Sequence, residues 1–309
     1  MDNPRTVDTP ATQVINSTVN ETSLLADIKS LIKVGIINSN LITTFTGFWL
    51  AVYFTGSSFQ WVTFLLTMFG TAFVIAGGCI INNWYDRDID PLMSRTDNRP
   101  TVTGSIPINV IKWMGISVSV IGIIILSFTT IPAAIFGAFG WFVYVILYTM
   151  WSKRKYTINT VVGSFSGAVP PLIGWAAVDP SLQLEALMLF MIMFIWQTPH
   201  FLALAMKKKD DYKAAGVPML PVVHGFQMTK RQIVIYVACL LPLPIYLASL
   251  GSVFLVIAFT LSLGWLILGI AGFFMKDDYK WATWMFVYSL NYLTILFVTM
   301  VLVTLPFPY

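Results

Sequence analysis

Charged residues are scarce in this sequence of 309 residues, of which Asp, Glu, Lys and Arg make up only 10%. Soluble domains carry about 25%, so a chain this poor in charge cannot cover a water-facing surface. The hydrophobic content of 57% and the mean hydropathy of +0.77 agree with this. The composition therefore excludes an ordinary soluble domain and favours a membrane protein.

Cysteine is almost absent, and so is any signal-peptide pattern. Cys79 and Cys239 both fall inside apolar runs, which argues against a disulfide framework and against a zinc site. Residues 1–28 are polar and lack an apolar core after a basic start, so they do not resemble a signal peptide. We expect residues 1–28 to form a flexible cytoplasmic tail and residues 29–309 to form a single domain.

Long apolar runs dominate the rest of the chain. A transmembrane helix needs about 20 such residues, and the runs lack the alternation of barrel strands, so they are expected to be helices. The sequence predicts an all-α membrane protein, a bundle of nine transmembrane helices. The predicted spans are 32–54, 59–83, 108–128, 131–151, 158–178, 184–206, 233–250, 252–275 and 282–305.

The basic residues predict the orientation of this bundle. All 18 Lys and Arg lie on one side of a nine-span arrangement, and basic loops face the cytoplasm. The N-terminus is then cytoplasmic and the C-terminus outside, as expected for a bacterial inner-membrane protein. Two long connections, after the second and the sixth span, lie on the same side, so a catalytic cavity is expected to open to the cytoplasm.

An acidic cluster ends the second span. Asn82, Asp86 and Asp90 are spaced four residues apart and share one face of a helix. Carboxylates at this spacing repel one another, the C-terminal end of a helix disfavours anions, and Pro91 ends the helix. These three effects oppose the arrangement, so a cation is expected to compensate for them.

Oxygen ligands of this kind suit magnesium, which binds one or two carboxylates together with phosphate oxygens. The cluster therefore indicates a magnesium–diphosphate site, although neutralisation by neighbouring basic residues would explain it too. Arg95 and Arg99 follow at once, and arginine matches phosphate oxygens with its planar fork. Anchoring of the loop at the cytoplasmic face is the alternative role for both.

The motif Asn82-x-x-x-Asp86-x-x-x-Asp90 resembles the first aspartate motif of the intramembrane aromatic prenyltransferases. With Met93-x-Arg95-Thr96-x-x-Arg99-Pro100 it is similar to their protohaem IX farnesyltransferase (haem O synthase) branch. Three further segments are similar to that branch: Asn159 with Gly167-Ala168-Val169-Pro170-Pro171-Leu172-Ile173-Gly174-Trp175, Trp196-Gln197-x-Pro199-His200-Phe201, and Asp211-Tyr212-x-x-Ala215-Gly216-x-Pro218-Met219-Leu220-Pro221.

The resemblance implies farnesyl diphosphate and haem b as substrates and Mg²⁺ as cofactor. The farnesyl group would join a porphyrin vinyl group with addition of water. Membrane lipid surrounds such an enzyme, haem A synthase is a partner by pathway alone, and no nucleic acid is expected.

The second loop departs from the wider superfamily, in which a second Asp-x-x-x-Asp occurs. Here the motif reads Lys207-x-x-x-Asp211, so we expect Lys207 to contact phosphate and Asp211 to help bind the metal. The predicted metal ligands and catalytic residues are Asn82, Asp86, Asp90 and Asp211. The predicted diphosphate ligands are Lys33, Arg95, Arg99, Lys153 and Lys207, with Arg154 or Lys155 able to replace Lys153.

His200 is the only histidine within a predicted span. About seven residues before Lys207, it lies roughly 10 Å inward of the basic edge at 1.5 Å per residue. We expect it to contact haem, as an axial ligand or through a carboxylate of the porphyrin. A hydrogen bond inside the bundle is the alternative.

Three other classes of membrane protein fit the sequence less well. A transporter also carries polar residues at mid-membrane, but here the charges concentrate at one face. A prenyltransferase of quinone or chlorophyll synthesis is opposed by the His200 segment and by Lys207. A lipid-head phosphotransferase would need an Asp-x-x-Asp-Gly-x-x-Ala-Arg string, which the sequence lacks.

Overall fold

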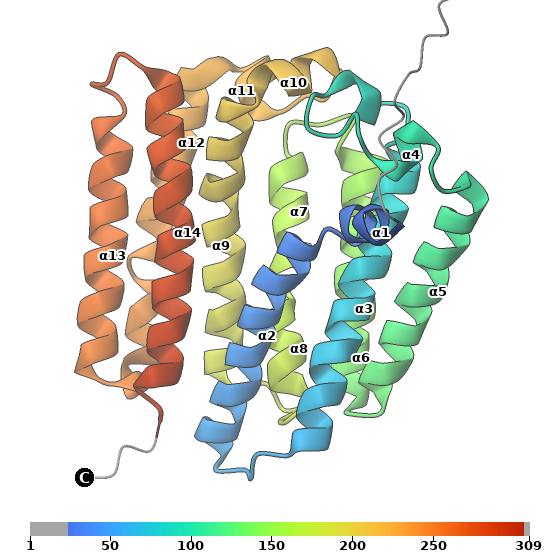
Figure 1. Ribbon diagram of the computed structural model, residues 1–309. Coiled ribbons are helices and arrows are strands. Elements are labelled where there is room, and N and C mark those ends of the chain that lie inside the picture. Colours follow the sequence, from blue (N-terminus) through green and yellow to red (C-terminus); the bar gives the residue numbers. More distant parts are fainter. Residues whose placement is uncertain (1–23, 306–309) are drawn as a thin grey trace, which may run out of the picture.

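The computed structural model describes residues 24–305, and within this range every regular element is a helix. The long helices run side by side as an elongated bundle (Figure 1), and short helices cover its upper end. Large apolar side chains fill the bundle, among them the fully buried Trp175, Trp265 and Trp281. The predicted all-α class is confirmed.

Seven helical segments in the described range are long and apolar enough to cross a membrane. They are α3 (Trp61–Tyr85), α5 (Ile108–Ser127), α6 (Ile131–Phe142) continued by the π-helical η2 (Val143–Ser152), α9 (Leu184–Lys207), α12 (Gly225–Leu240) continued by η3 (Leu243–Leu250), α13 (Ser252–Ala271) and α14 (Asp278–Leu302). The chain is therefore an integral membrane protein by the length and composition of its helices.

Two further helices coincide with predicted spans but are not among those seven. The helix α2 (Val34–Thr55) matches the span at 32–54 and carries polar residues such as Asn38, Asn40 and Thr43 in its first half. The span at 158–178 is divided into α7 (Asn159–Ala168) and α8 (Pro170–Ala176). The proline pair at 170–171 accounts for this break, because proline cannot donate a helical hydrogen bond.

The short helix α8 packs very closely against α2. A Cβ atom at Gly174 would lie 2.0 Å from the backbone oxygen of Thr44, and one at Gly47 would lie 2.1 Å from that of Pro171. No side chain fits in either gap, so glycine at both positions lets the two backbones touch.

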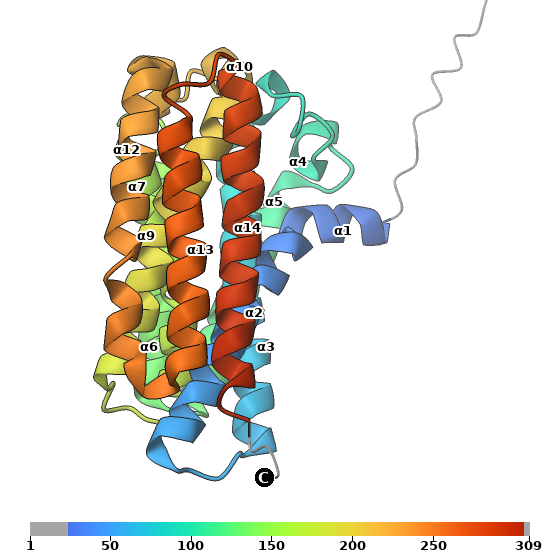
Figure 2. The same ribbon diagram turned by 90° about the vertical axis from the view of Figure 1, so that its left-hand side faces the viewer.

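The predicted tail is wrong for residues 24–28, which begin the helix α1 (Leu24–Ile32). The remainder of that tail, residues 1–23, lies outside the described residues. Figure 2 shows α1 projecting sideways from the bundle. Leu31 is buried with Ile80 and Ile111, and the buried Asn83 side chain donates to the Leu31 backbone oxygen at 3.0 Å. This local anchoring is not visible in hydropathy.

The seventh predicted span also begins too late. Its helix begins at Gly225 instead of 233, because the first two turns include Lys230 and Arg231, which a hydropathy threshold rejects. Lys230 is nevertheless buried, and its ammonium group binds the Gly272 carbonyl and the Asp278 carboxylate, each at 2.5 Å. The charge is therefore neutralised inside the helix end.

Both long connections lie at the same end of the bundle, the upper end in Figure 1, while α14 ends at the lower end. The first contains η1 (Asp90–Leu92) and α4 (Pro100–Thr103), and the second contains α10 (Lys209–Ala214) and α11 (Leu220–Val223). A small apolar cluster joins them, with Ile89 and Met93 packed among residues such as Tyr212 and Val217. The two loops thus form one layer over the helix ends.

Candidate active site

The end of α3 places Asn82 and Asp86 one helical turn apart. The Asn82 amide donates to Asp86 Oδ2 at 2.8 Å, and the two residues are 3% and 0% exposed. Asn82 also donates to Thr149 Oγ1 at 3.1 Å and accepts a hydrogen bond from the Lys33 ammonium at 2.5 Å. The predicted shared face is confirmed for this pair, and Lys33 reaches it from the junction of α1 and α2.

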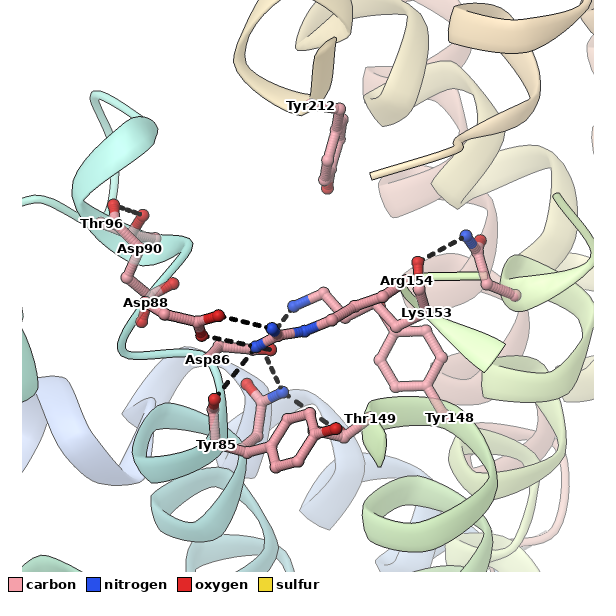
Figure 3. Close-up of polar contacts among 12 residues, drawn as sticks. Tyr85, Asp86, Asp88, Asp90, Thr96, Tyr148, Thr149, Lys153, Arg154 and Tyr212 are labelled. Atoms are coloured by element: carbon pink, nitrogen blue, oxygen red, sulfur yellow. Dashed lines mark hydrogen bonds and ion pairs between the residues drawn. The ribbon is translucent and has the colours of Figure 1, made fainter. Parts of the chain in front are cut away.

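Asp86 is held by two cations that follow η2. Lys153 binds Asp86 Oδ2, and Arg154 donates to Oδ1 at 3.3 Å. The wide turn of the π-helix sets this position, since the Lys153 amide bonds to the Tyr148 carbonyl five residues earlier at 2.9 Å. Such turns are frequent at functional sites. Figure 3 shows the cations of this segment directed at the end of α3.

Arg154 also makes a two-pronged ion pair with Asp88. Both distances to the Asp88 carboxylate oxygens are 2.7 Å, and the guanidinium lies 4.8 Å over the Tyr85 ring. The hydrogen bonds that Arg154 donates to Asp88 lower the pKa of Asp88 and raise the pKa of Arg154. Spacing missed Asp88, since it lies off the face of Asp86, although its place between two motif aspartates could have suggested it.

Asp90 lies beyond the helix, in the turn that begins η1. The Arg99 guanidinium donates to both carboxylate oxygens of Asp90, at 2.9 and 2.8 Å. The Thr96 hydroxyl donates to the Asp90 backbone oxygen at 2.7 Å. Burial raises the pKa of Asp90, against the opposing effect of Arg99. The Asp90 amide donates to the Asp86 carbonyl at 2.9 Å, which keeps Asp90 next to Asp86. Asn82, Asp86 and Asp90 together form the acidic row.

The second loop places Asp211 opposite the first one. The Ser94 hydroxyl donates to Asp211 Oδ1 at 3.3 Å. The other oxygen, Oδ2, is buried and accepts no hydrogen bond from residues 24–305, and the Lys208 ammonium is 3.7 Å away. A buried carboxylate oxygen without a partner is costly, which marks Asp211 as a group able to take a ligand.

Arg95 and Lys207 contact aromatic rings instead of carboxylates. Arg95 donates to the Tyr212 hydroxyl at 3.3 Å and lies 5.5 Å from the ring centre, and Lys207 lies 4.7 Å over the Phe286 ring. Figure 3 shows Tyr212 pointing down from the second loop toward Asp86 and Arg154. The structure thus places three of the five predicted phosphate ligands on the row at the end of α3 and two beside it.

The predicted metal ligands occupy two places. Between residues 24 and 305, no three Asp, Glu, His or Cys side chains come close enough to hold an ion together. Asn82, Asp86 and Asp90 lie at the end of α3 and in the turn after it, and Asp211 lies in the second loop, where Ser94 of the first loop donates to it. All are oxygen donors, the type that suits Mg²⁺.

His200 lies within α9, away from the acidic row. Its Nδ1 is 2.7 Å from Ser289 Oγ, and its ring stacks on Trp196 and on Phe286, with ring centres 4.8 Å apart in both cases. Lys207 on the same Phe286 ring connects this aromatic column to the loop end. The structure therefore gives His200 an environment of aromatic rings, and the acidic row one of ion pairs.

The chain is similar to a known family of membrane proteins. The profile of the UbiA prenyltransferase family matches residues 40–291. The chain belongs to the UbiA prenyltransferase family. Its matched region includes the acidic row, His200 and the second loop. Membership makes the chain a prenyltransferase.

Relatives named protoheme IX farnesyltransferase are similar over nearly the whole length of this UbiA prenyltransferase. One from Geobacillus sp. (strain WCH70) is 62% identical over 291 residues, which cover 94% of each chain. Protoheme IX farnesyltransferase 2 of Bacillus subtilis (strain 168) is 60% identical and covers 94% of this chain and 96% of its own. The resemblance read from the motifs is thereby confirmed.

Solved structures are similar in fold. A digeranylgeranylglyceryl phosphate synthase superposes with a TM-score of 0.72 at 20% identity, covering 91% of this chain and 98% of its own. A UbiA homolog from Archaeoglobus fulgidus bound to DMAPP and Mg²⁺ gives 0.68 at 14% identity, covering 89% and 99%. At these identities the likeness concerns the fold of a UbiA prenyltransferase alone.

Proposed function

We propose that this protein transfers the farnesyl group of farnesyl diphosphate to a vinyl group of haem b, with addition of water. The products are haem O and diphosphate. The observation that carries the proposal is the identity of about 60% over nearly the whole chain with proteins named protoheme IX farnesyltransferase. The acidic row, the basic side chains around it and the separate aromatic setting of His200 support it.

The donor set fits Mg²⁺, which would be held by Asn82, Asp86, Asp90 and Asp211. These are hard oxygen ligands, and the buried Asp211 Oδ2 accepts no hydrogen bond from the protein. Bound Mg²⁺ supplies charge stabilisation to a departing diphosphate. The UbiA homolog with DMAPP and Mg²⁺ is a precedent for this pairing in another protein.

The cations around the row are proposed to bind the diphosphate. Lys33 already donates a hydrogen bond to Asn82, and Lys153 and Arg99 already neutralise Asp86 and Asp90. Diphosphate oxygens offer stronger partners to ammonium and guanidinium groups, so these side chains can turn from carboxylate to phosphate when the donor enters. Arg95, from the first loop, and Lys207, at the end of α9, complete the proposed group.

Ionisation of the allylic bond leaves a delocalised carbocation beside the departing diphosphate. The basic side chains stabilise the negative charge as it develops, which lowers the barrier only if they are fixed in place beforehand. Water must stay away from the carbocation until it meets the vinyl carbon. His200 is proposed to contact the haem, further from the loop end.

We propose the full topology of nine spans, in which α2 and the broken α7–α8 pair cross the membrane with the seven apolar segments. The site then opens to the cytoplasm, the N-terminus is cytoplasmic and the C-terminus is outside. A bacterial inner membrane is the proposed location, in keeping with the bacterial origin of the relatives. Haem A synthase is proposed as a pathway partner only.

Extraction of haems from cells decides the function. A bacterial host lacking haem O should accumulate haem O when it expresses this chain. A matched host should not accumulate haem O when it expresses the Asp86→Asn variant at the same level in the membrane. Accumulation of a prenylated quinone without haem O would instead favour the related prenyltransferases. Haem b as the only haem in both hosts would contradict the proposal.

A further inference from the structure

The contact between α9 and α14 fixes the His200 ring on three sides. Trp196 and His200 lie one turn apart on α9, and Phe286 and Ser289 lie one turn apart on α14, so the two pairs face each other. The imidazole plane is inclined by 19° to the Trp196 ring and by 27° to the Phe286 ring. Rings stacked on both faces prevent the imidazole from tilting.

Ser289 has one hydroxyl proton, and the structure shows where it goes. The Ser289 oxygen lies 2.5 Å from the Phe286 carbonyl oxygen. Two oxygens approach so closely only with a proton between them, and a carbonyl has none to give. The Ser289 hydroxyl therefore donates to Phe286 and has only lone pairs left for its second contact, which is His200 Nδ1 at 2.7 Å.

A lone pair on Ser289 requires a proton on Nδ1. We infer that Ser289 is a positioning residue that holds His200 in the Nδ1–H tautomer and so keeps the lone pair on Nε2. This goes beyond the proposed function in assigning the tautomer, and it rests on that function in naming the ligand of Nε2, the iron of haem b.

The other contacts of His200 and Ser289 are those expected when one residue positions another as a metal ligand. Among residues 24–305, Nε2 of His200 makes no hydrogen bond, and the residue keeps 9% of its exposure. The Ser289 carbonyl also accepts the Trp196 indole N–H at 2.9 Å, so one residue of α14 holds both rings of α9. A histidine that binds a metal commonly donates its other N–H to such a partner, and neutral imidazole suits haem iron.

Nitrogen NMR tests the tautomer without haem. The chain has two histidines, so ¹⁵N-histidine labelling of His224→Gln leaves His200 as the single signal. We expect a protonated Nδ1 and an unprotonated Nε2. Ser289→Ala in the same background should give a mixture or the opposite tautomer, and Ser289→Thr should restore the original one. A protonated Nε2, or no response to Ser289→Ala, overturns the inference.

Titration with haem b tests the ligand. Ser289→Ala should weaken haem binding by roughly 10–100-fold and shift the haem absorption spectrum in the direction of His200→Ala. Ser289→Thr should behave as the unmodified protein, and a non-reactive farnesyl diphosphate analogue should bind all of them equally. If Ser289→Ala alters the tautomer but not the haem spectrum, the assignment of haem iron as the ligand of Nε2 is overturned. Normal haem binding by His200→Ala contradicts the haem role in the proposed function and leaves the tautomer result intact.

Discussion

Asp86 and Asp90 after α3, and Asp211 after α9, occupy the same end of the bundle but are neutralised in different ways. Lys153 and Arg154 hold Asp86, and Arg99 holds Asp90 with both oxygens within 2.9 Å. Asp211 receives one long hydrogen bond from Ser94, and its second oxygen has none. The first loop is thus internally balanced, while the second offers a carboxylate oxygen to a ligand.

This difference assigns different work to the two loops. On the proposed function, a balanced row would release cations for phosphate only as its carboxylates gain a metal, so metal binding and release of the cations would be linked by charge. Asp211 needs no such exchange, since nothing must leave before it binds. Substitutions in the first loop should therefore change several contacts at once, whereas those in the second should change one.

Asp86→Ala should have the largest effect. It removes a proposed metal ligand and leaves Lys153 without its carboxylate partner, while Arg154 keeps Asp88, so haem O formation should fall by roughly 10³-fold, as loss of several kcal/mol of charge stabilisation implies. Haem extraction measures this, with immunoblots for membrane level. Asp88→Ala is the matched control, because this carboxylate pairs with the same Arg154 but is 61% exposed. Wild-type haem O from Asp86→Ala would refute the metal assignment.

Asp211→Asn should have a smaller and more specific effect. The amide keeps the shape and one oxygen but loses the charge, so the Mg²⁺ concentration for half-maximal turnover should rise by about 10-fold. Thermal stability should hardly fall, because Oδ2 has no hydrogen bond to lose. A titration of activity against Mg²⁺ provides the measurement. An unchanged Mg²⁺ requirement would remove Asp211 from the metal site.

Arg99→Ala and Arg95→Ala compare a cation inside the row with one beside it. Both should raise the apparent Michaelis constant for farnesyl diphosphate more than that for haem b, by about 10-fold for a lost charge-assisted hydrogen bond. Arg99→Ala should also lower stability, since Asp90 is fully buried and would lose its partner. Steady-state kinetics with each substrate varied in turn measures both. A larger change for haem would contradict the grouping.

Lys208→Ala should have the smallest effect. Its ammonium is 3.7 Å from Asp211, and its side chain is 41% exposed, where ion pairs contribute about 0–1 kcal/mol. Turnover and Mg²⁺ dependence should change by less than about twofold on that estimate. A strong loss would mean that Lys208 binds substrate, and that the second loop is less simple than its contacts indicate.

Hydropathy and motif spacing predicted the helices and the polar cluster at the end of α3 because both are local properties. The break at Pro170 and the pairing of Asn82 with Asp86 follow from neighbouring residues. The start of α12 was missed because Lys230 counts as a charge in the sequence, whereas the structure neutralises it with Asp278, 48 residues later. Partners brought together by the fold are invisible to a sliding window.

The partners of individual side chains were beyond sequence reasoning for the same cause. Arg154 was no more than a substitute for Lys153 in the sequence, yet it pairs with both Asp86 and Asp88. Lys207 lies on the Phe286 ring, although its charge alone suggested a phosphate. The role of Ser289 depends on a contact between α9 and α14, which no motif records.

The close approach of α2 and α8 has a consequence for reading mutational tolerance. In a library of single substitutions, Gly47 and Gly174 would score as intolerant as Asp86, because any Cβ atom meets a backbone oxygen. Their intolerance would arise from overpacking, which costs about 1–3 kcal/mol, and would soften at low growth temperature. Intolerance at Asp86 would persist at every temperature. Repeating such a screen at two temperatures would separate the residues that build the enzyme from those that perform its reaction.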